Sequence, residues 1–113
     1  MKFPDKLYCY RAKLIRCVDG DTIWLEIDHG FHTFSRRSVR LARINTPEIR
    51  GEEKEEGLKA MFFVEDVLLN CSQIVVQSSN IDNFGRAIGE VWADQNNLSD
   101  LLVQEKLAIF KEY

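Results

Sequence analysis

Hydrophobic and polar residues from Tyr8 to Ile44 follow a strand-like pattern, with β-branched and aromatic residues and short turn signals. This pattern predicts strands at residues 8–18, 22–27 and 34–44. In the second of them Ile23, Leu25 and Ile27 share one face. Asp19-Gly20 is a turn signal between the first two strands, and Asp28-His29-Gly30 predicts a hairpin loop between the next two. Pro47 then ends the strand, because its ring fixes φ and removes a backbone donor.

After Pro47 the apolar period changes from two residues to three and four. This change predicts an amphipathic helix of about four turns over residues 57–71. The apolar residues expected to face inward are Leu58, Met61, Phe62, Leu68 and Leu69. Glutamates ahead of the helix complement the positive end of its dipole.

The last third of the chain returns to strands and closes with a helix. Strands are predicted at residues 73–78 and 87–93, with turns at 81–86 and 94–97. A short helix is predicted over residues 98–110, with Asn97 as its N-cap. Its expected inward residues are Leu98, Leu101, Leu102 and Leu107. Three strands, a helix, two strands and a last helix predict an α+β fold, the five-stranded OB-fold β-barrel with a helix between strands 3 and 4.

The length of 113 residues fits a single domain, residues 1–113. No apolar run approaches the roughly 20 residues of a membrane span, so no membrane partner is expected. The N-terminus lacks the apolar stretch of a signal peptide. Three cysteines without a CxxC pair favour reduced thiols and a cytoplasmic protein, although removal of a leader would make it secreted. A monomer is expected.

Charge is segregated along the chain, although the net charge is only −3. Four arginines lie between residues 36 and 43, and five glutamates lie between residues 48 and 56. The arginines could form a local anion site in an acidic protein, or both runs could be solvated faces of unrelated elements.

Three motifs add a resemblance to this pattern: VDGDTI at residues 18–23, VRLARINTPE at 39–48 and NFGRA at 83–87. Together, and with a helix expected between the second and the third, they resemble the staphylococcal nuclease (thermonuclease) family over roughly residues 10–108. The resemblance implies a calcium-dependent phosphodiesterase on an OB barrel. It implies cleavage of DNA and RNA with little sequence preference, and single strands are the expected preferred form.

The resemblance also implies roles for single residues. Asp21 and the backbone carbonyl of Thr46 would be calcium ligands, and Asp19 would shape the metal site. Glu48 would be the general base for the attacking water, while Arg40 and Arg86 would bind the scissile phosphate. The chemistry is consistent, because calcium prefers hard oxygen ligands and guanidinium groups pair bidentately with phosphate oxygens.

At three positions the chain departs from the family. Asn45 stands where the family usually has a calcium-binding aspartate, so its amide oxygen would bind the metal with one negative charge fewer and weaker affinity is expected. Phe84 replaces a tyrosine, which keeps stacking on the substrate but loses a hydrogen bond to phosphate. Lys106 occupies a place where glycine is typical. These departures leave open a weakened or inactive nuclease-like module that binds nucleic acid or a protein partner, and a purely structural accessory domain.

Each candidate residue also has a simpler interpretation. Asp19 and Asp21 could only form a turn, Arg40 could be a solvated strand residue, and Glu48 could favour the next helix. Their joint appearance favours the catalytic interpretation. The histidines and tryptophans are expected to have no such role. His29 and His32 lack a third soft ligand nearby in sequence, and Trp24 and Trp92 are expected to pack within the strands.

Overall fold

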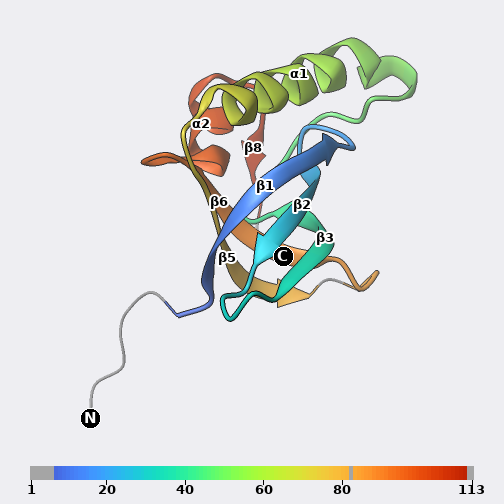
Figure 1. The fold of residues 1–113 in the computed structure, drawn as a ribbon. Helices are drawn as coiled ribbons and strands as arrows, with labels where there is room; N and C mark the ends of the chain where they lie inside the picture. Colours follow the sequence, from blue (N-terminus) through green and yellow to red (C-terminus); the bar gives the residue numbers. More distant parts are fainter. Residues whose placement is uncertain (1–6, 82, 112–113) are drawn as a thin grey trace.

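The fold is that of a computed structural model that describes residues 7–81 and 83–111. Five long strands form a barrel (Figure 1): β1 (Cys9–Cys17), β2 (Thr22–Asp28), β3 (Phe34–Leu41), β5 (Ile74–Ile81) and β6 (Ala87–Ala93). Their order is β3-β2-β1-β5-β6 with antiparallel neighbours, and a parallel pairing of β3 with β6 closes the barrel. The predicted five-stranded barrel of the α+β class is confirmed.

Two α-helices, one turn of 3-10 helix and three short strands complete the described fold. They are η1 (Gly51–Glu53), α1 (Lys54–Asn70) and α2 (Leu98–Gln104), with β4 (Ile44–Asn45), β7 (Asn96–Asn97) and β8 (Ile109–Phe110). Figure 1 shows α1 lying across one end of the barrel, whereas the β2–β3 hairpin points away at the opposite end. Neither helix of the described ranges has the length and apolarity needed to cross a membrane.

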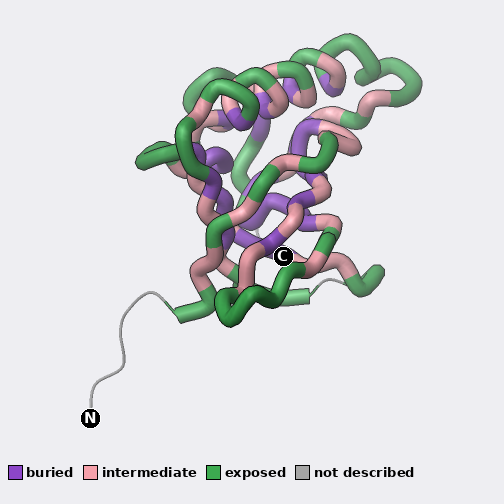
Figure 2. Tube along the Cα trace, viewed as in Figure 1, coloured by how far each residue is buried: buried purple, intermediate pink, exposed green. Residues whose placement is uncertain are grey.

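The core fills the barrel interior and the space beneath α1, where Figure 2 shows buried segments of both helices and the strands side by side. Ile23, Leu25 and Ile27 are buried there, so the predicted inward face of β2 is confirmed. Leu98 and Leu102 of α2 are also fully buried. Cys9, Cys17 and Cys71 are free thiols.

Helix α1 starts three residues earlier than predicted and buries a different face. Its buried residues are Gly57, Ala60, Val64 and Leu68. Only Leu68 was expected among them, and the inward prediction was wrong for Phe62 and Leu69, which are 56% and 68% exposed. The reason is close approach, because a Cβ on Gly57 would lie 2.2 Å from the Glu48 carbonyl oxygen. Small residues therefore form the face that packs on the barrel.

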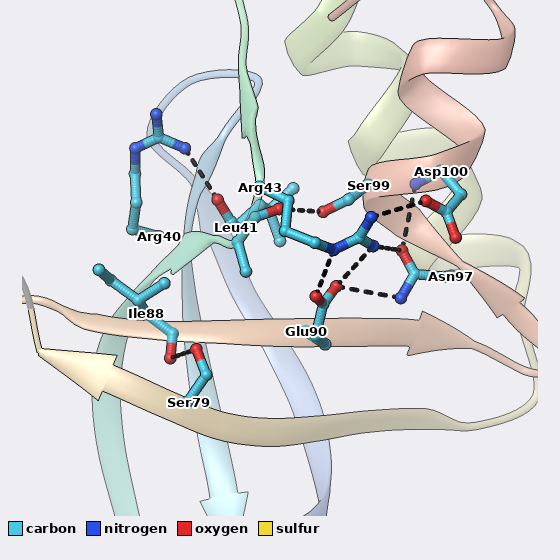
Figure 3. A network of polar contacts seen from close by, with 10 residues as sticks. Arg40, Leu41, Arg43, Ser79, Ile88, Glu90, Asn97, Ser99 and Asp100 are labelled. Carbon is cyan, nitrogen blue, oxygen red and sulfur yellow. Dashed lines mark hydrogen bonds and ion pairs between the residues drawn. The ribbon is translucent and has the colours of Figure 1, made fainter. Parts of the chain in front are cut away.

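The third strand ends at Leu41 rather than at residue 44, because the chain turns at Ala42 and Arg43. Arg43 has φ +68° and lies in the left-handed region. Polar contacts fix this turn (Figure 3): Arg43 Nε donates to Glu90 Oε2 at 2.6 Å and Nη1 to Asp100 Oδ1 at 3.1 Å, while Ser99 Oγ donates to the Ala42 carbonyl at 2.9 Å. They join the end of β3 to β6 and α2.

Helix α2 ends at Gln104, six residues earlier than predicted. Lys106 has φ +61°, and the amide of Leu107 donates to the Leu102 carbonyl at 2.8 Å, which is the Schellman ending of a helix. The chain then extends into β8, which pairs with β4. The predicted N-cap is confirmed, since Asn97 Oδ1 accepts from the Asp100 amide at 3.1 Å.

Candidate functional site

The turn between β1 and β2 rests against two other parts of the chain. Asp19 Oδ1 accepts a hydrogen bond from the Asp21 amide at 3.1 Å, which closes the turn locally. A Cβ added to Gly20 would lie 2.7 Å from Ala60 Cβ of α1 and 2.9 Å from Thr46 Oγ1. Only glycine fits between them without displacement, so this turn brings Asp21 close to the residues that follow β4.

Asp21 is buried and its carboxylate is fully engaged. Oδ2 accepts from the Thr46 amide at 3.1 Å, and it lies 3.3 Å from Arg40 Nη2 in an ion pair between two buried side chains. Oδ1 accepts from Thr22 Oγ1 at 3.3 Å. The first residue of β2 and the end of β3 are thus held together around one carboxylate.

Arg40 joins the two side chains that were predicted as calcium ligands. Besides its contact with Asp21, its Nη2 donates to Asn45 Oδ1 at 3.1 Å. Its Nη1 donates to the Leu41 carbonyl at 2.9 Å, as Figure 3 shows. The guanidinium therefore has a fixed orientation and neutralises the buried charge of Asp21.

The two aspartates of the turn have opposite pKa shifts. Burial raises the pKa of Asp21, but hydrogen bonding with Asp19, the charge of Arg40 and the Thr46 amide outweigh it and lower the pKa overall. Burial first, and then the hydrogen bond with Asp21 and its charge, raise the pKa of Asp19 to about 6. In mildly acidic solution Asp19 therefore takes up a proton while Asp21 stays ionised.

Arg86 approaches the same site from the start of β6. Its Nη1 donates to Thr22 Oγ1 at 3.4 Å, and its guanidinium carbon lies 5.7 Å from the centre of the Phe84 ring. Phe84 is 85% exposed, so one face of its ring is available to a ligand. Thr22 thus contacts both Asp21 and Arg86.

Thr22 is the site residue that sequence reasoning missed. Its cross-strand partner is Arg40, so it lies on the face of β2 opposite to Ile23 and Leu25. The sequence did contain a sign of this role. Thr22 directly follows Asp21, and in a strand with alternating faces it lies on the face opposite to the buried isoleucines and leucine.

Glu48 follows the site in the chain, two residues after Thr46, and its side chain is exposed. Its backbone carbonyl packs against Gly57 of α1. Within the described residues, no three His, Cys, Asp or Glu side chains gather as they would around a metal ion. The structure thus brings together Asp21, Arg40, Asn45, Thr46 and Arg86, whereas the Glu48 side chain, two residues after Thr46, is exposed to solvent.

The oxygen atoms available in this group are of the chemical type that a hard cation such as calcium prefers. Asp21 offers a carboxylate, Asn45 an amide oxygen, and Thr46 Oγ1 is buried without a hydrogen-bond partner in the described part of the chain. Such oxygens are the ligands that calcium prefers. Only one of these three donors carries a charge, and that charge already faces Arg40.

Comparisons with known proteins give a relative and a family. A region of the uncharacterized protein MJ1439 of Methanocaldococcus jannaschii is 26% identical over 117 aligned residues, which cover 84% of this chain and 54% of that protein. The chain thus spans about half the length of this relative. Residues 38–113, which include Arg40, Glu48 and Arg86, match the family described as staphylococcal nuclease homologue, whose members typically use calcium. With this match over more than half of its length, the chain belongs to the staphylococcal nuclease homologue family.

Proposed function

We propose that the protein is a calcium-dependent phosphodiesterase that hydrolyses DNA and RNA with little sequence specificity and prefers single strands. The observation that carries this proposal is the convergence of the buried Asp21 carboxylate with Arg40 and Arg86 at one end of β2. Hydrolysis of a phosphodiester needs neutralisation of a charged phosphate, for which this group offers two guanidinium groups, and an activated water, for which Glu48 is the candidate base. Membership in the family supports the assignment.

Asp21, Asn45 and Thr46 would hold the calcium ion, with Thr46 contributing its backbone carbonyl and its buried hydroxyl. When bound, the ion supplies Lewis-acid stabilisation of charge on the phosphate. The amide of Asn45 supplies no charge, so affinity for calcium should be weak.

The chain's own groups would carry the remaining steps. Glu48, which is exposed two residues after Thr46, would accept the proton of the attacking water. Arg40 and Arg86 would pair with phosphate oxygens, and contacts with the Leu41 carbonyl and Thr22 hold these two guanidinium groups in place before substrate binds. Phe84, exposed beside Arg86, would stack on a base.

A cleavage assay tests the proposal. Calcium should stimulate hydrolysis of single-stranded DNA, and Glu48→Ala or Arg40→Ala should lower kcat by about a hundredfold or more. Because Arg40 is buried against Asp21, its variant is interpreted only if circular dichroism shows a folded protein. Glu48 is exposed and gives the cleaner result, with Lys59→Ala on α1 as a control. Intact DNA and RNA across a calcium titration to tens of millimolar would contradict the proposal.

One observation favours a second candidate, a nuclease-like module that binds nucleic acid or a protein without cutting. Arg40 already contacts the oxygens of both Asp21 and Asn45, so a cation at this position would compete with an internal guanidinium. Single-stranded DNA that binds tightly but stays intact at every calcium concentration would support this candidate.

A further inference from the structure

The outer face of β1, β2 and β3 carries a row of basic and aromatic side chains that begins at the candidate site. Residues directly opposite each other in antiparallel strands point to the same face of a sheet. From Thr22 and Arg40, the pairs on this face continue through Trp24 with Ser38, Glu26 with Arg36, and Asp28 with Phe34. On the other side of β2, the same face carries Arg16, Lys13 and Arg11 of β1. We call these residues, together with Phe31 at the hairpin tip, the outer strand face.

Cations exceed carboxylates on this face beyond Arg40, although the protein as a whole is acidic. Its cations there are Arg11, Lys13, Arg16 and Arg36, and its carboxylates are Glu26 and Asp28. Glu26 lies 3.7 Å from Arg36, and Asp28 Oδ1 accepts from the Gly30 amide at 2.8 Å. The charge of the outer strand face therefore complements a polyanion.

Aromatic rings are spaced along the same face. Trp24 is half-buried, with the guanidinium carbon of Arg16 5.9 Å from its ring centre. Phe34 is 57% exposed and Phe31 is fully exposed. Trp24 was expected only to pack within the strands, but its position between Arg16 and Ser38 leaves part of the indole open to solvent.

The hairpin tip holds Phe31 in an unfavourable backbone conformation. Phe31 and His32 have φ values of +54° and +59°, in the left-handed region that bulky residues rarely occupy. The His29 amide donates to the Thr33 carbonyl at 2.8 Å, and the Thr33 amide donates to the Gly30 carbonyl at 2.9 Å. Strain that surrounding hydrogen bonds maintain is common at binding sites. Here it keeps an aromatic ring in solvent.

A cleft of about 620 Å³ adjoins this row. Arg11, Lys13 and Phe34 line it from the sheet, and Leu69 and Cys71 line it from the end of α1. The seven residues of β3 from Phe34 to Arg40 span about 20 Å. This length and the cleft can take a strand of several nucleotides, within the usual range for an OB fold of about 4 to 16.

We infer that the outer strand face binds the single-stranded DNA or RNA that extends from the candidate cleavage site. Trp24, Phe34 and Phe31 stack on bases, and the cations between them contact the phosphates. This inference rests on the proposed function for the position of the scissile phosphate. A nucleic acid fits better than a protein segment, because cations and aromatic rings share this face, as phosphates and bases require, and the row is continuous with Arg40.

Binding to a fluorescein-labelled oligothymidylate of about 12 nucleotides tests the inference, with EDTA present so that no cleavage occurs. Phe34→Ala and Phe31→Ala should each raise Kd by about tenfold. Phe62→Ala on α1 is a matched control, since Phe62 is 56% exposed, and it should leave Kd unchanged. Phe31 is fully exposed, so its loss does not remove core packing.

Salt dependence tests the basic residues. Arg36→Ala should reduce the slope of log K against log salt concentration by about 1. Lys59→Ala is its matched control: the two cations are 73% and 67% exposed and lie 3.7 and 3.6 Å from a glutamate. Equal slopes for Arg36→Ala and the unmodified protein would contradict the inference.

Tryptophan fluorescence identifies the face directly, because the chain has only Trp24 and Trp92. The unlabelled oligonucleotide should quench the fluorescence of Trp92→Phe, which retains Trp24, and leave that of Trp24→Phe unchanged. Quenching that persists in Trp24→Phe, or an unchanged Kd in all phenylalanine variants, would overturn the inference. Binding on this face without cleavage would refute only the proposed nuclease. Cleavage with unchanged KM in the Phe31, Phe34 and Arg36 variants would refute only this inference.

Discussion

At the scale of single residues, Asn45 limits the charge available to a metal ion. Its amide oxygen lies 3.1 Å from Arg40 Nη2, next to the Asp21 carboxylate that accepts from the Thr46 amide. Asn45→Asp adds one negative charge, so we expect calcium affinity to rise by about tenfold or more, as measured by isothermal titration calorimetry. Faster cleavage in this variant would identify a weakened enzyme, and tighter calcium binding without cleavage would identify a binding module. An unchanged calcium affinity would show that residue 45 is not a ligand.

Asp19 gives the folded protein a specific pH dependence. Its pKa rises from 3.8 to about 6, so the folded state binds a proton more readily than the unfolded chain. This contribution to stability is complete below about pH 4 and is lost as the pH rises through about 6. Asp19→Asn should remove it, while the Asn side chain still accepts from the Asp21 amide.

The measurement for Asp19 is the free energy of urea unfolding at intervals between pH 4 and 7. The free energy of unfolding of the original protein should fall relative to that of Asp19→Asn as the pH rises across this range, because only the original protein has a carboxyl group here that ionises. The shift of Asp21 has the opposite sign, and its contribution is lost only as the pH falls through its lowered pKa. A difference that stays constant with pH would show that Asp19 titrates normally.

The resemblance implied that Asp21, Asn45, Thr46 and two arginines lie together, as they do in the structure, but not how they contact each other. The same expectation for Glu48 stays a prediction. Asp21 immediately precedes the second strand and Asn45 and Thr46 follow the third, so antiparallel pairing was enough to bring them together. The ion pair of Arg40 with Asp21 depends on a register in which Thr22 faces Arg40, and no local pattern specifies that register. The fit of Gly20 against Ala60 likewise exists only after α1 packs on the barrel.

At the scale of elements, the end of α2 carries a residue that does not suit its backbone. Lys106 occupies a left-handed position in a Schellman ending, where glycine is favoured. Lys106→Gly should therefore increase the free energy of unfolding by up to about 1 kcal/mol, because relief of strain exceeds the entropy that glycine adds to the unfolded chain. Urea unfolding measures this change. Lys106→Ala keeps the strain and should show no such gain.

Helix α1 shows where hydrophobic periodicity was a poor guide. The pattern favours large apolar residues as the buried face, but the helix packs through Gly57 and Ala60 and leaves Phe62 exposed. Close approach of Gly57 to the Glu48 carbonyl decides the orientation, and this contact is between residues of different elements. The turn at Arg43 was missed for a similar reason, since Glu90 and Asp100, which stabilise it, are distant in sequence.

At the scale of the whole molecule, the order of strands and helices was enough to predict the barrel. The hydrophobic pattern did not predict that β3 pairs with β6 to close the barrel. It also did not predict the short strands β4, β7 and β8. Two-residue strands have too little sequence to show a period. The short strands have few backbone hydrogen bonds of their own. The side-chain contacts of Arg43 add connections here, because they join the end of β3 to β6 and α2 (Figure 3).

Removal of metal should leave the stability of the molecule unchanged. Arg40 already neutralises Asp21, so EDTA should not shift the melting temperature, and calcium at a concentration equal to Kd should add only about 0.4 kcal/mol. Arg40→Leu should instead cost about 3 to 5 kcal/mol, because it leaves a buried carboxylate unpaired. Thermal unfolding measures both. A large drop of the melting temperature in EDTA would mean that an ion, and not Arg40, holds the site together.

Arg40 also makes the binding of anions and cations at this site interdependent. A phosphate group that pairs with its guanidinium competes with Asp21 and Asn45 for the same donors. Once those two oxygens are released, they are available to a positive ion, so each ligand should raise the affinity for the other. Thermodynamic reciprocity requires the two factors to be equal. The site would then be loaded with metal mainly when a nucleic acid strand is present.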